Sequence, residues 1–189
     1  MLRAREPHWI DPMNQHDQTV MPMAACGSYE EGRKLLGVPS EMNVAPFPIS
    51  KDRIAAFCAL IEDSNPRYWD ALSELGRTPA PPAMIQAWTL TLPWVPPGFA
   101  PRPQLMLLNL PLPGRTLINV STDIVYDRPL YVGELIHFYD VATKISDEKV
   151  TRLGRGHFLT TVCYIQNSDS DPVATITNVH LRYEPKASA

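Results

Sequence analysis

The ten residues Ile61–Asp70, IEDSNPRYWD, are those of this chain best suited to acid–base chemistry. Asp63, Asn65 and Pro66 have the types and spacing of the first half of an acid–base motif, which would place a histidine two residues after the proline. Tyr68 occupies that position instead. The sequence therefore leaves two alternatives: an enzyme with an altered base, or an enzyme-like subunit whose partner moves the protons.

An acid–base catalyst works best when its pKa lies near the working pH. Histidine, with a pKa of about 6.5, meets this requirement, whereas tyrosine, at about 10, does not. Nearby carboxylates at Asp63 and Asp70 would raise the pKa of the Tyr68 phenol, and Arg67 alone is not expected to offset them. We therefore expect Tyr68 to donate a hydrogen bond or to pack. For Asp63 two roles stay open: an acceptor that closes the turn at Asn65, which is the commoner role, or a catalytic carboxylate.

Two helices are expected to position these groups. The first begins after Ser50, a favoured N-cap residue, and ends before Pro66. The second runs over Pro81–Leu92, because proline suits a first helical turn and Pro93 stops the helix. The second helix is apolar almost all round, which is typical of a buried helix. Along the first helix, apolar residues recur at i, i+3, i+4 and i+7, namely Ile54, Phe57, Cys58 and Ile61.

The last part of the chain alternates with a period of two, which indicates β-strands. Short polar links of hairpin type separate four long strands, so the sequence predicts an antiparallel meander. The fold class is therefore α+β, with an antiparallel sheet wrapped around one buried helix. A polar arm over residues 1–45, with a short helix near Ser28–Leu36, is expected to precede a domain over residues 46–189. The alternating strands begin at Thr116, Leu135, Phe158 and Val173.

Composition excludes several function classes. The formal charge is −3 and no basic run is present, which argues against a nucleic-acid or anionic-membrane surface. No stretch approaches the roughly 18 apolar residues of a membrane span. Three widely spaced cysteines fit neither disulfides nor a zinc site, so we expect a cytoplasmic location. No metal or redox cofactor is expected.

Three segments, in this order, carry a resemblance to a known family. Asp63–Tyr68 ends the first helix, Ala80–Ala83, APPA, opens the second, and Tyr126–Glu134, YDRPLYVGE, leads into the long strands. The chain resembles MaoC-like hot-dog dehydratases and R-specific enoyl-CoA hydratases over about residues 45–185. It is most similar to their N-terminal-type domain, the fatty-acid-synthase-like dehydratase domain.

The resemblance implies an acyl-binding subunit. Catalytic members carry Asp-x-Asn-Pro-x-His, whose Asp and His handle the water, whereas N-terminal-type domains often lack the histidine. Such a chain would belong to an enoyl-CoA hydratase or 3-hydroxyacyl-thioester dehydratase, a lyase of lipid, polyketide or steroid side-chain metabolism. A partner hot-dog chain would supply the catalytic Asp and His, although a homodimer stays open. The residues expected to bind the acyl thioester are Asn65, Ala83, Met84 and Trp88, with the Ala83 and Met84 N–H groups as an oxyanion hole.

Three other hypotheses stay open. A self-sufficient homo-oligomeric hydratase would combine Asp63 with a histidine from elsewhere, such as His157 or His180. A hot-dog acyl-CoA thioesterase would orient water with Gln86, the only amide of the second helix, and would leave the turn without a purpose. A structural or ligand-sensing hot dog would bind without turnover. The apolar residues of the second helix, with Trp94 beyond it, would line an acyl tunnel or form ordinary core.

Overall fold

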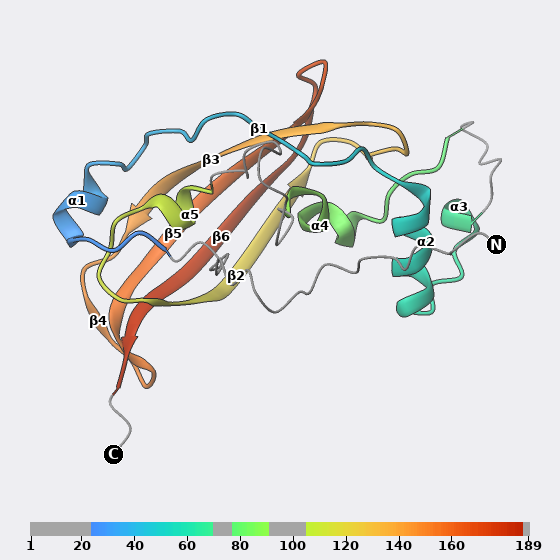
Figure 1. Cartoon of the computed structure of the whole chain (residues 1–189). Helices are drawn as coiled ribbons and strands as arrows, with labels where there is room; N and C mark the ends of the chain where they lie inside the picture. Colours follow the sequence, from blue (N-terminus) through green and yellow to red (C-terminus); the bar gives the residue numbers. More distant parts are fainter. Residues whose placement is uncertain (1–23, 70–76, 91–104, 187–189) are drawn as a thin grey trace, which may run out of the picture.

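The computed structural model describes residues 24–69, 77–90 and 105–186 (Figure 1). Within them, all strand pairs are antiparallel and form one sheet with the order β1-β3-β5-β6-β2, while β4 pairs with β5 beside this path. The strands are β1 Asn43–Val44, β2 Thr116–Tyr126, β3 Ile136–Ile145, β4 Lys149–Val150, β5 Gly154–Asn167 and β6 Pro172–Pro185. The predicted α+β class and the four long antiparallel strands are confirmed.

The expected meander is wrong for its first strand. β2 does not pair with β3, the next long strand, but crosses to the far edge of the sheet and pairs with β6, with Ile118 opposite Leu181. The nine residues 127–135 between β2 and β3 are too long for a tight hairpin turn, and they carry the chain across the helical side. Among the four long strands, only β3 and β5 pair with the next long strand along the chain, and the short β4 pairs with β5.

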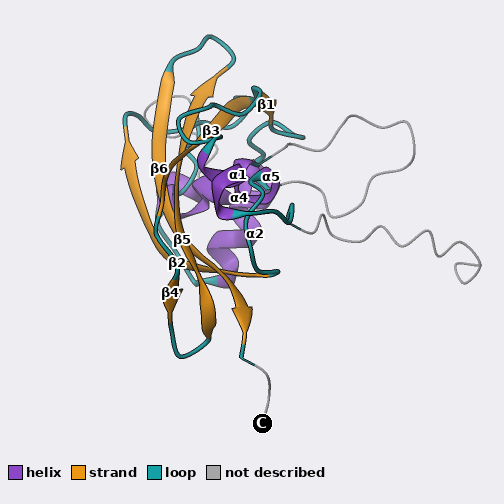
Figure 2. Cartoon of the chain, turned by 90° about the vertical axis from the view of Figure 1, so that its left-hand side faces the viewer, coloured by secondary structure: helices purple, strands orange, loops and turns teal. Residues whose placement is uncertain are grey.

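The helices lie on one face of the curved sheet, as Figure 2 shows, and α1 and α2 sit near opposite ends of it in Figure 1. Ser50 caps α2 as expected, since its side chain accepts from the Arg53 N–H, and Ile54 and Cys58 are fully buried. The helices are α1 Tyr29–Arg33, α2 Lys51–Leu60, α3 Pro66–Trp69, the 3-10 turn η1 Pro82–Met84, α4 Ile85–Thr89 and α5 Met106–Asn109.

The buried second helix, η1 with α4, is shorter than its sequence predicts. It ends at Thr89, because Leu90 is extended with φ −67° and ψ 134°. The predicted burial is confirmed for one side of this helix: three residues are buried, whereas Ala83 is exposed. The buried residues are Met84, Ile85 and Trp88.

Apolar side chains between the helices and the sheet form two clusters. The larger joins α2 and α4 to the strands, and the smaller lies around α5 and receives side chains from the segment around α1. Burial of this apolar surface is the main term that holds the helices on the sheet.

A buried arginine links the described part of the arm to the sheet. Arg182 on β6 is fully buried, and its guanidinium donates to the carbonyl oxygens of Leu110 at 2.8 Å, Gly114 at 3.0 Å and Ala25. Three chain segments therefore meet at one side chain. The division of the chain at residue 45 stays a prediction. No helix within the described ranges has the length and apolar character needed to cross a membrane.

Candidate functional site

The predicted acid–base stretch forms a helix exit followed by a turn. The Asp63 N–H donates to the Cys58 carbonyl at 2.8 Å, which closes the end of α2. The Asp63 Oδ1 atom accepts from the Asn65 N–H at 2.9 Å, and the Asn65 Oδ1 atom accepts from the Arg67 N–H at 3.2 Å. The Trp69 indole donates to the Asp63 carbonyl at 2.6 Å. One carboxylate oxygen of Asp63 thus stabilises the turn, which is the structural role weighed from the sequence.

Tyr68 lies on α3, directly after this turn, with its side chain half-buried against the larger core cluster. Burial raises the pKa of the Tyr68 phenol, the Asp63 carboxylate raises it further, and Arg67 only partly opposes them. A phenol with a raised pKa stays protonated at neutral pH, so it can donate a hydrogen bond but is a poor base. The catalytic roles of Asp63 and Tyr68 remain predictions.

The start of the buried helix offers fewer free donors than expected. The Met84 N–H is not free, because it donates to the Pro81 carbonyl at 3.0 Å within the 3-10 turn. The Ala83 N–H has no acceptor among the described residues, and Ala83 is exposed. An oxyanion hole at this helix would therefore rest on Ala83 alone.

A pocket of about 340 Å³, here called the helix–linker pocket, lies between the buried helix and the linker to β3. Trp88, only 2% exposed, lines it, and the Arg53 guanidinium covers the indole with its carbon 4.5 Å from the ring centroid. Arg53 also donates to the Ala87 carbonyl at 3.1 Å, so the stack is fixed. The pocket is lined by Ala80, Pro81, Pro82, Ile85, Trp88, Tyr126, Asp127, Arg128, Pro129, Leu130 and Val173.

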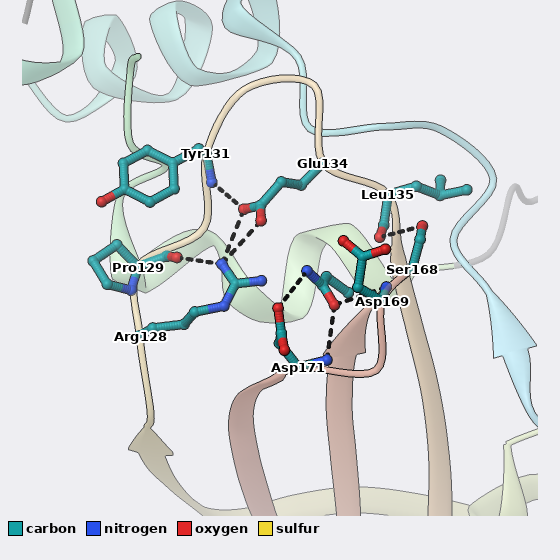
Figure 3. A network of polar contacts seen from close by, with 9 residues as sticks. Arg128, Pro129, Tyr131, Glu134, Leu135, Ser168, Asp169 and Asp171 are labelled. Carbon is teal, nitrogen blue, oxygen red and sulfur yellow. Dashed lines mark hydrogen bonds and ion pairs between the residues drawn. The ribbon is translucent and has the colours of Figure 1, made fainter. Parts of the chain in front are cut away.

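The linker side of this pocket is held by a polar network (Figure 3). The Arg128 Nη1 atom lies 2.9 Å from a Glu134 carboxylate oxygen and donates to the Pro129 carbonyl at 2.9 Å. The Tyr131 N–H donates to Glu134 at 2.7 Å. The Tyr126 hydroxyl donates to the Pro82 carbonyl at 2.7 Å and ties the end of β2 to the helix start. The sequence marked this stretch only as a family signature and gave no signal for the pocket.

The predicted site residues divide between two places. Trp88 lines the helix–linker pocket, whereas Asp63 lines a second pocket with Cys58, Ser64 and Trp69, and the two linings share no residue. Within the described ranges, the structure does not bring the turn and the helix into one cavity. Four residues named from the sequence lie outside those ranges: Asp70, Leu92, Pro93 and Trp94.

The strand histidines line neither pocket. His157 is buried, stacks on Tyr29 with ring centroids 4.9 Å apart, and has Nδ1 2.9 Å from the Ser146 carbonyl oxygen. His180 is buried on β6, and burial lowers its pKa, so it is neutral at pH 7. Neither arrangement places an imidazole beside the Asp63 carboxylate.

A curved antiparallel sheet with a short buried helix against its helical face defines a hot-dog fold. The chain belongs to the family described as FAS1-like, dehydratase domain region, which it matches over residues 35–176, and it is a MaoC-like hot-dog dehydratase domain.

Two curated proteins are similar to this chain in sequence, and one solved structure is similar to it in fold. A probable enoyl-CoA hydratase alpha subunit from Thermomonospora curvata is 32% identical over 153 residues, which cover 74% of this chain and 46% of that protein. The 3-oxo-4,17-pregnadiene-20-carboxyl-CoA hydratase alpha subunit of Mycobacterium tuberculosis is 30% identical over 155 residues, 79% of this chain and 50% of that protein. The chain thus spans about half the length of these relatives.

A chain of the ChsH1-ChsH2 complex from Mycobacterium tuberculosis has a similar structure, with a TM-score of 0.62. The likeness covers 84% of this chain and 92% of that one at 23% sequence identity, so it concerns the fold.

Proposed function

We propose that this chain is the acyl-binding subunit of an enoyl-CoA hydratase or 3-hydroxyacyl-thioester dehydratase, and that a partner hot-dog chain supplies the catalytic Asp and His. One observation carries the proposal. Where catalytic members have an imidazole, this chain has the Tyr68 phenol, whose pKa is raised by burial and by Asp63. Two relatives named as hydratase alpha subunits support the same function.

The partner would pair along the free edge of the sheet, as hot dogs pair. β2 is an edge strand of 11 residues and, among the described strands, pairs only with β6. Val120 and Val125 on β2 are 51% and 66% exposed. Long apolar edge strands favour pairing with another chain, so β2 is suited to extend a joint sheet. The existence of a solved complex for a structural neighbour supports a hetero-oligomer.

The proposed substrate is an acyl thioester, held without a metal or redox cofactor in the cytoplasm. The name of the Mycobacterium tuberculosis relative makes a steroid side-chain acyl-CoA one candidate. Apolar side chains such as Ile85, Leu130 and Val173 line the helix–linker pocket and would contact the apolar acyl group.

Assays of the purified chain, alone and with a co-purifying MaoC-like partner, test this proposal. We expect the lone chain to bind an enoyl-CoA without hydrating it, and the complex to hydrate it. In the complex, Tyr68→Phe should retain activity, because the hydroxyl proton is not transferred. Rapid hydration by the lone chain, with a pH-dependent activity that Asp63→Ala or Tyr68→Phe abolishes, would refute the proposal that a partner supplies the catalytic residues. Release of free CoA thiol would instead indicate a thioesterase.

A further inference from the structure

The residues that line the helix–linker pocket divide into a buried set and an exposed set. Ile85, Trp88 and Val173 are 3%, 2% and 0% exposed, so they form the closed inner end of the pocket. Pro82 and Tyr126 are exposed, so they lie at its mouth. An occupant therefore enters between the start of the buried helix and the end of β2, and it reaches inward toward Trp88.

The inner end of the pocket offers an occupant an apolar surface without charge. Two aliphatic side chains and the indole ring of Trp88 make up this end. Of the charged lining residues, Asp127 is exposed, and Arg128 is paired with Glu134 at 2.9 Å. An unpaired polar group buried at the inner end would cost free energy, whereas each buried methylene group stabilises binding. The inner end therefore fits a hydrocarbon chain.

The Trp88 indole stands between the pocket and α2. It lines the pocket, and the Arg53 guanidinium of α2 covers its ring, with the guanidinium carbon 4.5 Å from the ring centroid. Arg53 also donates to the Ala87 carbonyl at 3.1 Å, which fixes the stack. The buried α2 residues Ile54 and Cys58 belong to the same core cluster as Trp88, yet no α2 residue is among those that line the pocket. A packed ring in this position limits how far a bound chain can reach.

The volume of the pocket limits the size of the occupant. At about 30 Å³ for a group the size of a water molecule or a methylene, a pocket of about 340 Å³ holds about ten carbon atoms. A tetracyclic steroid body has roughly twice as many carbon atoms, so much of it would stay outside, whereas ligand sites usually bury at least about 70% of the ligand's surface. With the thioester at the mouth, an open hydrocarbon chain fits the pocket better than a steroid.

We propose that Trp88 determines the length of the acyl chain that this protein accepts, and that the helix–linker pocket takes an open-chain acyl group of up to about ten carbon atoms beyond the thioester. This inference rests on the proposed function and adds to it the residue that limits the acyl group. A smaller side chain in place of the indole extends the pocket toward α2. A larger side chain at Ala80, a lining residue that is 7% exposed, reduces the space in the pocket.

Calorimetric titration of the full chain with saturated straight-chain acyl-CoAs, from hexanoyl to hexadecanoyl, tests the inference. Saturated chains cannot be hydrated, so binding is measured without turnover. For the wild-type protein, the affinity should rise by up to about fourfold for each added methylene group and should stop rising near dodecanoyl-CoA. Trp88→Leu should move this limit to chains longer by about two or more carbon atoms, and Ala80→Leu should move it to shorter chains.

Trp69→Leu is the matched control, because it makes the same change outside this pocket and should leave the chain-length limit unchanged. If Trp88→Leu does not fold, Ala80→Leu tests the same limit, because it fills space in the pocket rather than leaving a cavity. Three results would overturn the inference and leave the proposed function standing: an affinity that rises without a break to hexadecanoyl-CoA, a limit that the Trp88 or Ala80 substitution leaves in place, or tighter binding of a steroid carboxyl-CoA than of decanoyl-CoA. If no acyl-CoA binds more tightly than CoA itself, the proposed function is overturned as well.

Discussion

Substitution of Asp63 tests whether its carboxylate has a structural or a catalytic role. The Asp63 Oδ1 atom accepts a single 2.9 Å hydrogen bond from the Asn65 N–H in a partly exposed turn. Asp63→Ala removes this bond and should cost about 1 kcal/mol of unfolding free energy. In a chain of this size that lowers the melting temperature by about 2–4 °C. Asp63→Asn retains a side-chain carbonyl oxygen and should melt within a degree of the wild type.

The paired assay is thermal unfolding of the lone chain and enoyl-CoA hydration by its complex with the proposed partner chain. A general acid or base contributes typically about 10²–10⁴-fold to rate, and an amide cannot replace it. If Asp63 serves only the turn, both variants should keep kcat within about threefold of the wild type, because the cost lies in folding rather than in proton transfer. A hundredfold loss of kcat in Asp63→Asn, without a change in melting temperature, would refute this reasoning and place a catalytic group in the turn.

Three more predictions concern buried groups. Arg182→Met should lower the urea-unfolding free energy by about 3 kcal/mol, because three carbonyls lose their donor, whereas exposed Arg155→Met should change it by under about 0.5 kcal/mol. His180 has a lowered pKa in the native state, so the unfolded chain takes up the proton first as the pH falls. The free energy of unfolding should therefore decrease as the pH drops below about 6.5. In urea titrations, His180→Gln should reduce the slope of the unfolding free energy against pH. A thiol reagent should label only Cys26 in the native chain and all three cysteines in denaturant. The other two cysteines are buried, and burial raises the pKa of Cys163 to about 12. Fast labelling of two cysteines in the native chain would contradict this prediction.

Local signals in the sequence were sufficient for the elements near the turn. Ser50 and the spacing of Ile54 and Cys58 predict α2 because capping and one buried face are properties of adjacent residues. The hydrogen bond between Asp63 and the Asn65 N–H follows from the same kind of short-range preference. These features depend on nothing far along the chain.

Features set by distant partners were not predictable. The place of β2 depends on pairing with β6, and the pattern of alternation that marks a strand says nothing about its neighbour. Alternation also does not tell which face of a strand is buried when both faces carry apolar residues. In β3 the buried residues include Ile136, Phe138 and Ala142, not the equally regular set that contains His137 and Tyr139.

The same reason explains what was missed in the site. An arginine in a strand is usually exposed, so the burial of Arg182 depends on three carbonyls from two other segments, at Ala25 and at 110–114, that only the folded chain brings together. The helix–linker pocket likewise joins residues from α4, the 126–130 stretch and β6. Trp88 is the only one of the predicted acyl-binding residues that lines this pocket, and the sequence indicated it through the burial of the second helix.

The pairing of β2 with β6 has a consequence for how the protein is made. During synthesis β2 leaves the ribosome before β3, β5 and β6, yet its only partner among these strands is the last of them. The intervening strands can form hairpins as they emerge, since their contacts are close along the chain. Both edges of β2 therefore stay unpaired until β6 is synthesised. A nascent chain at this stage is most prone to aggregation or to pairing of β2 with a wrong strand. Stable assembly with a second hot dog should follow the release of β6 rather than precede it.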